Sequence, residues 1–141
     1  MANRRPIATV TYRLQVHAGF DLRAVRRVVP YLARLGVSHV YLSPILQARP
    51  DSRHGYDVVD PTRLDPKLGM PADLAALVRT LRRHAMGLVL DIVPNHMAAG
   101  PDNRYWTDVL THGDAGAGRA SAPRGSPPAS SRRVARRRAR C

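Results

Sequence analysis

The chain has 141 residues, of which 44% are apolar, and its formal net charge at pH 7 is +13. This length and composition predict one globular domain of modest size with a hydrophobic core. They argue against a membrane protein, because no apolar run approaches the roughly 18 to 20 residues needed to cross a bilayer and the N-terminus has no apolar signal core. We therefore expect a cytoplasmic location, and the single cysteine, Cys141, allows no internal disulfide.

Strand and helix signals alternate along the first part of the chain. β-branched and aromatic residues predict a strand over residues 7–15. Apolar residues at three- and four-residue spacing then predict an amphipathic helix that begins after the N-cap Asp21 and closes at Gly36. Pro30 lies inside this pattern and predicts a kink or a break, because proline removes a backbone donor and crowds the preceding turn. A short second strand is predicted over residues 37–42.

A long polar stretch and a second helix precede the third strand. Residues 45–69 show little periodicity, which predicts a functional loop rather than a plain connection. Pro71 suits the first position of a second helix, which has Leu74, Leu77, Val78 and Leu81 on one face. Residues 87–93 form a near-continuous apolar run that is typical of a strand in a parallel sheet. Asp91 interrupts this run and indicates a functional site, because a buried carboxylate is costly unless it is paired.

The order strand, helix, strand, helix, strand predicts an α/β fold with right-handed crossovers and a parallel sheet. The loops that follow parallel strands share one edge of the sheet. The loop over residues 45–69 and the motif DIVPNH at residues 91–96 are therefore expected to converge. Ligands bind at this edge in open α/β sheets and in closed barrels.

Four motifs carry a resemblance to a known family: TYRLQ at residues 11–15, YLSP at 41–44, HGYDVVDP at 54–61 and DIVPNH at 91–96. Together they resemble the α-amylase superfamily of (β/α)8-barrel enzymes, and within it the maltooligosyl trehalose synthase family most closely. The resemblance implies that residues 1–110 are the first β-α-β-α-β part of a TIM barrel. It also implies an isomerase that acts without a cofactor on a maltooligosaccharide substrate. This enzyme would convert the reducing-end α-1,4 link to an α,α-1,1 link by intramolecular transglucosylation.

The resemblance further implies roles for five residues. His96 would hydrogen-bond the sugar next to the scissile bond, Tyr56 would stack on its apolar face, and His54 would line the same pocket. Asp91 would orient neighbouring polar groups, and Asn95 would support the loop that holds His96. Alternatives stay open, since His96 taken alone is a loop histidine and Tyr56 a tyrosine that packs. No metal is expected, because Asn95 and His96 lack further ligands at suitable spacing.

The catalytic groups of this superfamily are expected to be absent from the chain. Its ten acidic residues are all Asp, so no Glu is present to serve as the general acid. By resemblance, the nucleophilic Asp, the acid/base Glu and a third carboxylate lie on strands after the third one. This chain alone is therefore expected to be inactive. A fragment of another α-amylase-superfamily hydrolase or transglucosylase stays an alternative.

Residues 111–141 differ in composition from the rest of the chain. They contain eight Arg and one Asp, no aromatic residue, and mostly Ala, Arg, Gly, Pro and Ser, which predicts a disordered basic tail. One interpretation is a frameshift in a GC-rich gene, because all five residue types have GC-rich codons and a polybasic arm usually includes Lys. The other is an arm that binds nucleic acid non-specifically, which would make the chain a small basic binding protein.

Overall fold

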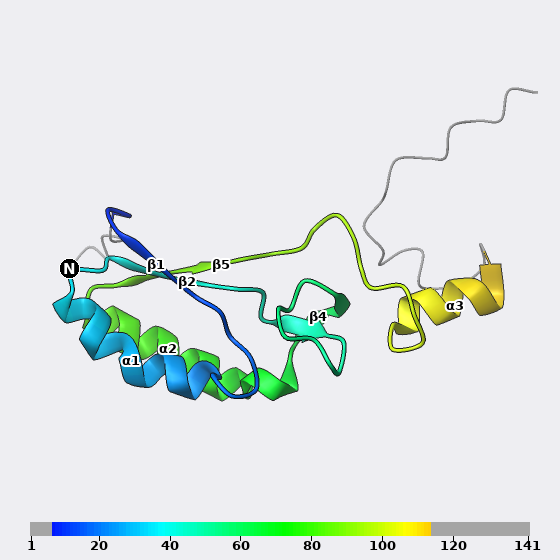
Figure 1. The fold of residues 1–141 in the computed structure, drawn as a ribbon, viewed down its shortest axis with the longest axis horizontal. Coiled ribbons are helices and arrows are strands. Elements are labelled where there is room, and N and C mark those ends of the chain that lie inside the picture. Colours follow the sequence, from blue (N-terminus) through cyan, green and yellow to red (C-terminus); the bar gives the residue numbers. More distant parts are fainter. Residues whose placement is uncertain (1–6, 114–141) are drawn as a thin grey trace, which may run out of the picture.

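The computed structural model describes residues 7–113, and its central element is a three-stranded parallel sheet (Figure 1). The strand order is β1-β2-β5, with strands β1 (Thr11–Leu14), β2 (His39–Leu42) and β5 (Gly87–Leu90). Helices α1 (Leu22–Arg34) and α2 (Pro71–Arg83) lie in the connections between these strands and cover one face of the sheet (Figure 1). The predicted α/β order and the parallel sheet are confirmed.

Helix α1 begins where the sequence predicts. The Asp21 carboxylate accepts a hydrogen bond of 2.8 Å from the Ala24 amide, which satisfies one of the free donors of the first turn. The helix then continues without interruption through Pro30, so the chain does not break there, and the alternative of a kink stays a prediction. Val29 and Leu32 on either side are buried in the core, and this packing offsets the loss of one backbone hydrogen bond.

The stretch over residues 45–69 is more regular than the sequence predicts. β3 (Leu46–Ala48) and β4 (Val58–Leu64) pair as antiparallel strands, and a short 3-10 helix, η1 (Pro66–Leu68), follows. The prediction that this stretch is a loop is therefore wrong, while its functional role stays a prediction. Pro61 within β4 and register shifts in the pairing interrupt the alternation by which a strand is recognised. The tip of this hairpin carries the HGYD motif.

The third strand is shorter than predicted. β5 ends at Leu90, so Asp91 follows the strand instead of lying inside it. The Asp91 amide still donates to the Leu42 carbonyl oxygen at 3.0 Å, which keeps this residue at the edge of the sheet. Beyond it the chain leaves the sheet and forms α3 (Arg104–His112), a helix that the sequence patterns did not indicate (Figure 1).

Most of the predicted tail lies outside the described residues. Thr111 and His112 belong to α3, which therefore crosses the predicted division of the chain at residue 110. That division, and the interpretations offered for the tail, stay predictions. Within residues 7–113, no helix has the length and apolar character required to cross a bilayer.

The hydrophobic core lies between the sheet and its two helices. Val40 and Leu42 of β2 are fully buried in a cluster with apolar residues of α1 and α2. Because side chains alternate along a strand, Tyr41 and its partner in β5, Val89, lie on the opposite face. Val89 is 39% exposed, and within the described residues no helix covers this second face (Figure 1).

Candidate functional site

Asp91 is the centre of a polar cluster at the carboxyl end of the sheet. Its Oδ2 atom accepts a hydrogen bond of 2.9 Å from the Tyr41 hydroxyl and a second one from the Tyr56 hydroxyl. Tyr41 belongs to β2, Tyr56 to the tip of the β3–β4 hairpin, and Asp91 follows β5. The predicted convergence of the hairpin region with the start of DIVPNH is confirmed at this contact.

Arg13 of β1 extends the cluster to the remaining strand of the sheet. Its guanidinium donates to the Tyr56 hydroxyl at 3.2 Å and to the Gln15 side-chain oxygen at 3.0 Å. The same guanidinium lies 5.7 Å from the centre of the Tyr41 ring, within the range of a cation–π contact. Strands β1 and β2 and the residue that follows β5 therefore each contribute a side chain at the edge where ligands bind in α/β proteins.

The cluster holds Asp91 in its ionised form. The hydrogen bond from Tyr56, supported by the one from Tyr41, keeps the pKa of Asp91 below its ordinary value, although burial acts in the opposite direction. The same contact raises the pKa of Tyr41, because its hydroxyl proton is bound to the Asp91 carboxylate. Asp91 is thus a fixed anion at neutral pH, with the positive charge of Arg13 nearby.

Gly55 allows the hairpin tip to bring Tyr56 to this carboxylate. Its φ angle is +79°, in the left-handed region that other residues rarely adopt. A Cβ atom at this position would lie 2.7 Å from the Pro44 carbonyl oxygen, so any side chain would force the two segments apart. The Gly55 amide also donates to the Ser52 hydroxyl at 3.1 Å, which fixes the turn immediately before Tyr56.

His54 lies beside Tyr56 and is exposed. Its Nδ1 atom accepts a hydrogen bond of 3.0 Å from the Tyr56 amide, and the two ring centroids are 5.9 Å apart. The Gln15 side-chain amide donates to the His54 carbonyl oxygen at 3.2 Å and so ties the hairpin tip to the segment after β1. The structure therefore places the predicted residues His54, Tyr56 and Asp91 in one group.

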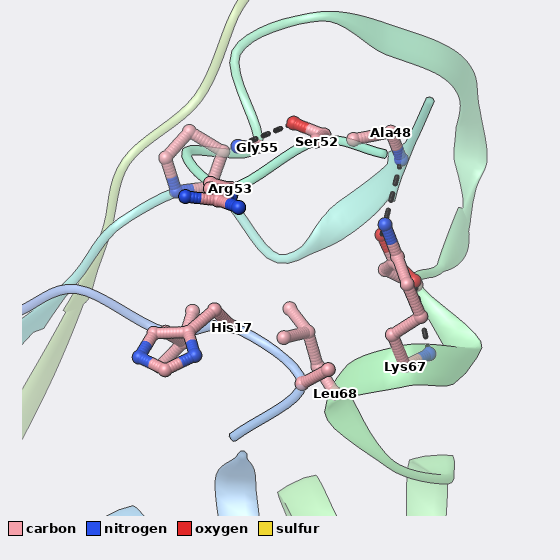
Figure 2. Close-up of a pocket in the computed structure, with 11 residues that line it drawn as sticks. His17, Ala48, Ser52, Arg53, Gly55, Lys67 and Leu68 are labelled. Atoms are coloured by element: carbon pink, nitrogen blue, oxygen red, sulfur yellow. Dashed lines mark hydrogen bonds and ion pairs between the residues drawn. The ribbon is translucent and has the colours of Figure 1, made fainter. Parts of the chain in front are cut away.

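A small cavity lies beside the hairpin tip (Figure 2). His17, Arg53 and Lys67 lie around it, and the Lys67 ammonium donates to the Arg49 carbonyl oxygen at 2.8 Å. Its volume of about 20 Å³ is enough for one water molecule and far too small for a sugar ring. This cavity therefore offers no sugar site.

Asn95 and His96 form a second group. The His96 Nδ1 atom lies 3.0 Å from the Asn95 side-chain oxygen, and both residues are exposed. Across residues 7–113, no hydrogen bond or ion pair joins either of them to Asp91, Tyr56 or His54. They line instead a hollow of about 300 Å³ together with aromatic residues of α3.

Helix α3 is tied to the hairpin by polar contacts. The Arg104 guanidinium forms an ion pair of 3.1 Å with the buried Asp60 of β4. The Ala98 amide donates to the Val58 carbonyl oxygen at 2.8 Å, and the Asn103 side chain donates to the Ala98 carbonyl oxygen at 2.7 Å. These contacts hold the chain after DIVPNH beside the hairpin.

Sequence reasoning missed three members of the site: Arg13, Gln15 and Tyr41. Each belongs to the TYRLQ or YLSP motif, and each stands at or near the carboxyl end of a predicted strand. That position was the available signal, because polar residues at this edge of a parallel sheet commonly face a ligand. In the described part of the chain, no group of three or more His, Cys, Asp or Glu side chains is arranged to hold a metal ion.

Comparisons with known proteins agree with this architecture. Residues 14–116 match the family described as alpha amylase, catalytic domain. The chain is 46% identical over 110 residues to a putative maltooligosyl trehalose synthase of Mycobacterium tuberculosis, a match that covers 73% of this chain and 14% of that protein. It is 38% identical over 96 residues to an intracellular maltogenic amylase of Bacillus subtilis, covering 68% of this chain and 16% of the amylase.

A solved structure, that of the maltooligosyltrehalose synthase from Arthrobacter ramosus, superposes with a TM-score of 0.73 at 49% identity. The superposition covers 77% of this chain and 15% of the synthase, so the chain spans only a small part of the length of its relatives. The match to the family extends over well more than half of the chain, from β1 to the end of α3. The chain therefore belongs to the α-amylase family, and residues 14–116 correspond to part of its catalytic domain.

Proposed function

We propose that this chain forms the first part of the sugar-binding wall of a maltooligosyl trehalose synthase. Such an enzyme converts the reducing-end α-1,4 link of a maltooligosaccharide to an α,α-1,1 link by intramolecular transglucosylation. The observation that carries this proposal is the higher identity to the synthases, 46% and 49%, than to the maltogenic amylase, 38%. A hydrolase of the same family is the weaker candidate on this ground.

The geometry supports a sugar-binding role for the hairpin tip. Tyr56 presents an aromatic ring at the carboxyl end of the sheet, and such a ring can cover the C–H face of a pyranose. Its hydroxyl is held by Asp91 and Arg13, which would keep the ring in one orientation before a sugar arrives. Preorganisation of this kind reduces the ordering cost of binding. His54, exposed next to Tyr56, would then donate to or accept from a sugar hydroxyl.

His96 would contact the sugar from the second group. Its ring is exposed and lies 3.0 Å from the Asn95 side-chain oxygen, a contact through which Asn95 would orient it. The hollow beside α3 leaves space around His96 for a ligand. In this proposal a maltooligosaccharide contacts both groups, with Tyr56 on one side and His96 on the other.

Catalysis of the glucosyl transfer would need carboxyl groups from outside this chain. A retaining mechanism uses two carboxyl groups about 5 to 5.5 Å apart on either side of the sugar bond. The chain contains no Glu, and Asp91 already serves as acceptor for two tyrosine hydroxyls. We therefore expect the isolated chain to bind maltooligosaccharide without converting it, and a mixture with maltopentaose should yield no non-reducing product above a protein-free control.

Binding of maltopentaose to the full chain tests the proposal. Titration followed by NMR should give saturable shifts with maltopentaose and none with the β-linked cellopentaose. Tyr56→Ala and His96→Ala should each weaken binding by at least about tenfold, as expected for loss of one stacked or hydrogen-bonded sugar contact. Tyr12→Ala is the matched control, because Tyr12 is exposed on β1 but lies on the other face from Tyr41. Equal binding of both oligosaccharides, or no binding by a folded chain, would contradict the proposal.

A further inference from the structure

The positive charge of the described residues is concentrated on the two helices beneath the sheet. Together α1 and α2 carry seven Arg and one Asp, a net charge of +6. The rest of residues 7–113 carries five Arg, one Lys and eight Asp, a net charge of −2. The sheet, the hairpin and α3 are thus slightly acidic as a group, whereas the helical layer is strongly basic.

The arginines lie on the outward side of both helices. Arg27 and Arg34 are seven residues apart in α1, and Arg82 and Arg83 follow Arg79 by three and four residues in α2. These spacings place each set on one side of its helix. All five residues are exposed, while the opposite sides of the helices are buried against the sheet. The helices lie next to each other on the outside of the sheet (Figure 1).

The two helices also run in the same direction, which brings their arginines together. The Arg23 guanidinium and the Asp73 carboxylate are 2.8 Å apart and join the first turns of α1 and α2. Because both helices connect parallel strands, their last turns lie at the same end of the layer. Arg34 and Arg82 belong to these last turns and therefore share that end.

Contacts within the described part of the chain do not account for these arginines. No hydrogen bond or ion pair is made there by the side chains of Arg27, Arg34, Arg79 or Arg82, in contrast to Arg23. A favourable effect on the helix ends would explain Arg34 and Arg82, since cations stabilise the last turn of a helix. It would not explain Arg27 and Arg79, which lie before the last turn.

An aromatic side chain stands among the arginines. Tyr31 follows Arg27 by four residues and precedes Arg34 by three, so it lies on the same side of α1. It is 55% exposed and is the one large hydrophobic residue within α1 and α2 that is exposed. We define the outer helix face by the residues Arg27, Tyr31, Arg34, Arg79 and Arg82.

We propose that the outer helix face binds single-stranded nucleic acid, with its arginines on the phosphates and Tyr31 stacked on a base. The guanidinium group suits phosphate because its planar set of donors can bind two oxygens at once. Stacking of bases on aromatic side chains next to a basic surface is the usual mode of single-strand binding. An anionic membrane fits less well, because the large aliphatic side chains of both helices point into the core and leave little to insert.

This inference does not rest on the proposed sugar-binding function. The site around Asp91 lies at the carboxyl end of the strands, whereas the outer helix face lies on the outside of the helical layer (Figure 1). A chain that fails to bind maltopentaose could still bind an oligonucleotide through α1 and α2. The two proposals therefore fail or hold separately.

The test measures fluorescence anisotropy of a labelled single-stranded 20-mer with the full chain, at salt concentrations between 50 and 200 mM. The first variant replaces Arg27, Arg34, Arg79 and Arg82 by Gln. Its matched control removes the same charge from the C-terminal segment through Arg132→Gln, Arg133→Gln, Arg136→Gln and Arg137→Gln. Tyr31→Ala and Tyr31→Phe test the stacking contact. Far-UV dichroism establishes that each variant keeps its helices.

The proposal expects the first variant to bind at least about tenfold more weakly at 100 mM salt. It should also reduce the slope of log K against log salt concentration by about 3, since each lost phosphate contact on a single strand contributes about 0.7. Tyr31→Ala should weaken binding to the single strand by about tenfold and leave binding to a duplex of the same sequence unchanged. Tyr31→Phe keeps the ring and should bind the single strand as tightly as the original chain. Binding that is lost only in the C-terminal control would overturn the proposal. So would unchanged binding by Tyr31→Ala, or binding to anionic vesicles with no binding to the oligonucleotide.

Discussion

The Tyr41 hydroxyl lies 2.9 Å from the Asp91 carboxylate and joins the carboxyl ends of β2 and β5 through side chains 50 positions apart in the chain. The Tyr56 hydroxyl binds the same oxygen from the hairpin tip. One carboxylate thus connects two neighbouring strands and the segment that carries the candidate sugar-stacking ring. Asp91 thus ties Tyr56 to the sheet.

Removal of the Tyr56 hydroxyl should raise the pKa of Asp91 toward its ordinary value. In the folded chain this pKa is lowered, with the hydrogen bond from Tyr56 as the largest cause. The change Tyr56→Phe keeps the ring and removes only the donor. The measurement is the pH dependence of the Asp91 carboxyl carbon shift by NMR, with Tyr12→Phe as the control. An Asp91 pKa that is the same in the original chain and in Tyr56→Phe would show that this hydrogen bond does not stabilise the anion.

The lowered pKa of Asp91 also determines how the stability of the fold changes with pH. A carboxyl group whose pKa is lower in the folded state stabilises the fold above its unfolded pKa of about 3.9. This contribution is lost as the pH falls from that value through the folded pKa of Asp91. The contact between Tyr56 and Asp91 should therefore loosen in acid, and Tyr56→Phe should reduce the loss of stability between neutral and acidic pH.

The substitution Gly55→Ala should displace the hairpin tip. It places an L-residue at a φ angle of +79° and a methyl group 2.7 Å from the Pro44 carbonyl oxygen. Gly36→Ala is a matched control, because Gly36 has a φ angle of +80° and nothing within 4 Å of an added Cβ. The backbone strain alone costs about 1 kcal/mol or somewhat more at either position.

Only Gly55→Ala should also break the contact between Tyr56 and Asp91. NMR nuclear Overhauser effects between the Tyr56 ring and residues near Asp91 would report this, and urea denaturation would report the stability of both variants. If the two alanine variants lost equal stability and kept these Overhauser effects, the close approach to Pro44 would not control the hairpin tip.

The uncovered face of the sheet should bind a hydrophobic dye. Val89 is 39% exposed, and in the described residues no helix packs over it. Val89→Thr should lower the fluorescence of bound dye with a change in stability within about 0.5 kcal/mol, as for most surface substitutions. Val40→Thr is the matched control on the buried face. It should cost about 1 to 3 kcal/mol, because it places a hydroxyl in the core. The opposite ranking of the two variants would contradict the assignment of the faces.

The periodic spacing of apolar residues predicted the helices that bury an apolar face. It failed to predict the elements in which that spacing is interrupted. Helix α1 and helix α2 follow the predicted spacing, and the Asp21 cap and Pro71 start are where the sequence places them. The β3–β4 hairpin was missed because Pro61 and register shifts hide its alternation. Helix α3 has no buried residue, so the apolar pattern that reveals a core-facing helix is weak there.

The sequence indicated Asp91, the centre of the candidate site, but it did not indicate all of the side chains that gather around it. Asp91 stands out in the sequence as a charge at the end of an apolar run, and Tyr56 was included through the HGYD motif. Arg13 and Tyr41 were not, although both stand near the carboxyl end of a predicted strand, because that position does not show which side chains meet across neighbouring strands. The separation of His96 from this group depends on how the chain turns after Asp91, which no spacing rule describes.

The most direct measurement is the activity of a chimera. Residues 7–113 of this chain would replace the matching segment of the Arthrobacter ramosus maltooligosyltrehalose synthase, which supplies the rest of the barrel. With maltopentaose, the chimera should lower the number of reducing ends and form a product with a terminal α,α-1,1 link. Tyr56→Ala or His96→Ala in the chimera should reduce kcat/KM by at least about tenfold, which corresponds to about 1.4 kcal/mol of transition-state stabilisation. A folded chimera that only hydrolyses maltopentaose, or that is indifferent to both substitutions, would contradict the account.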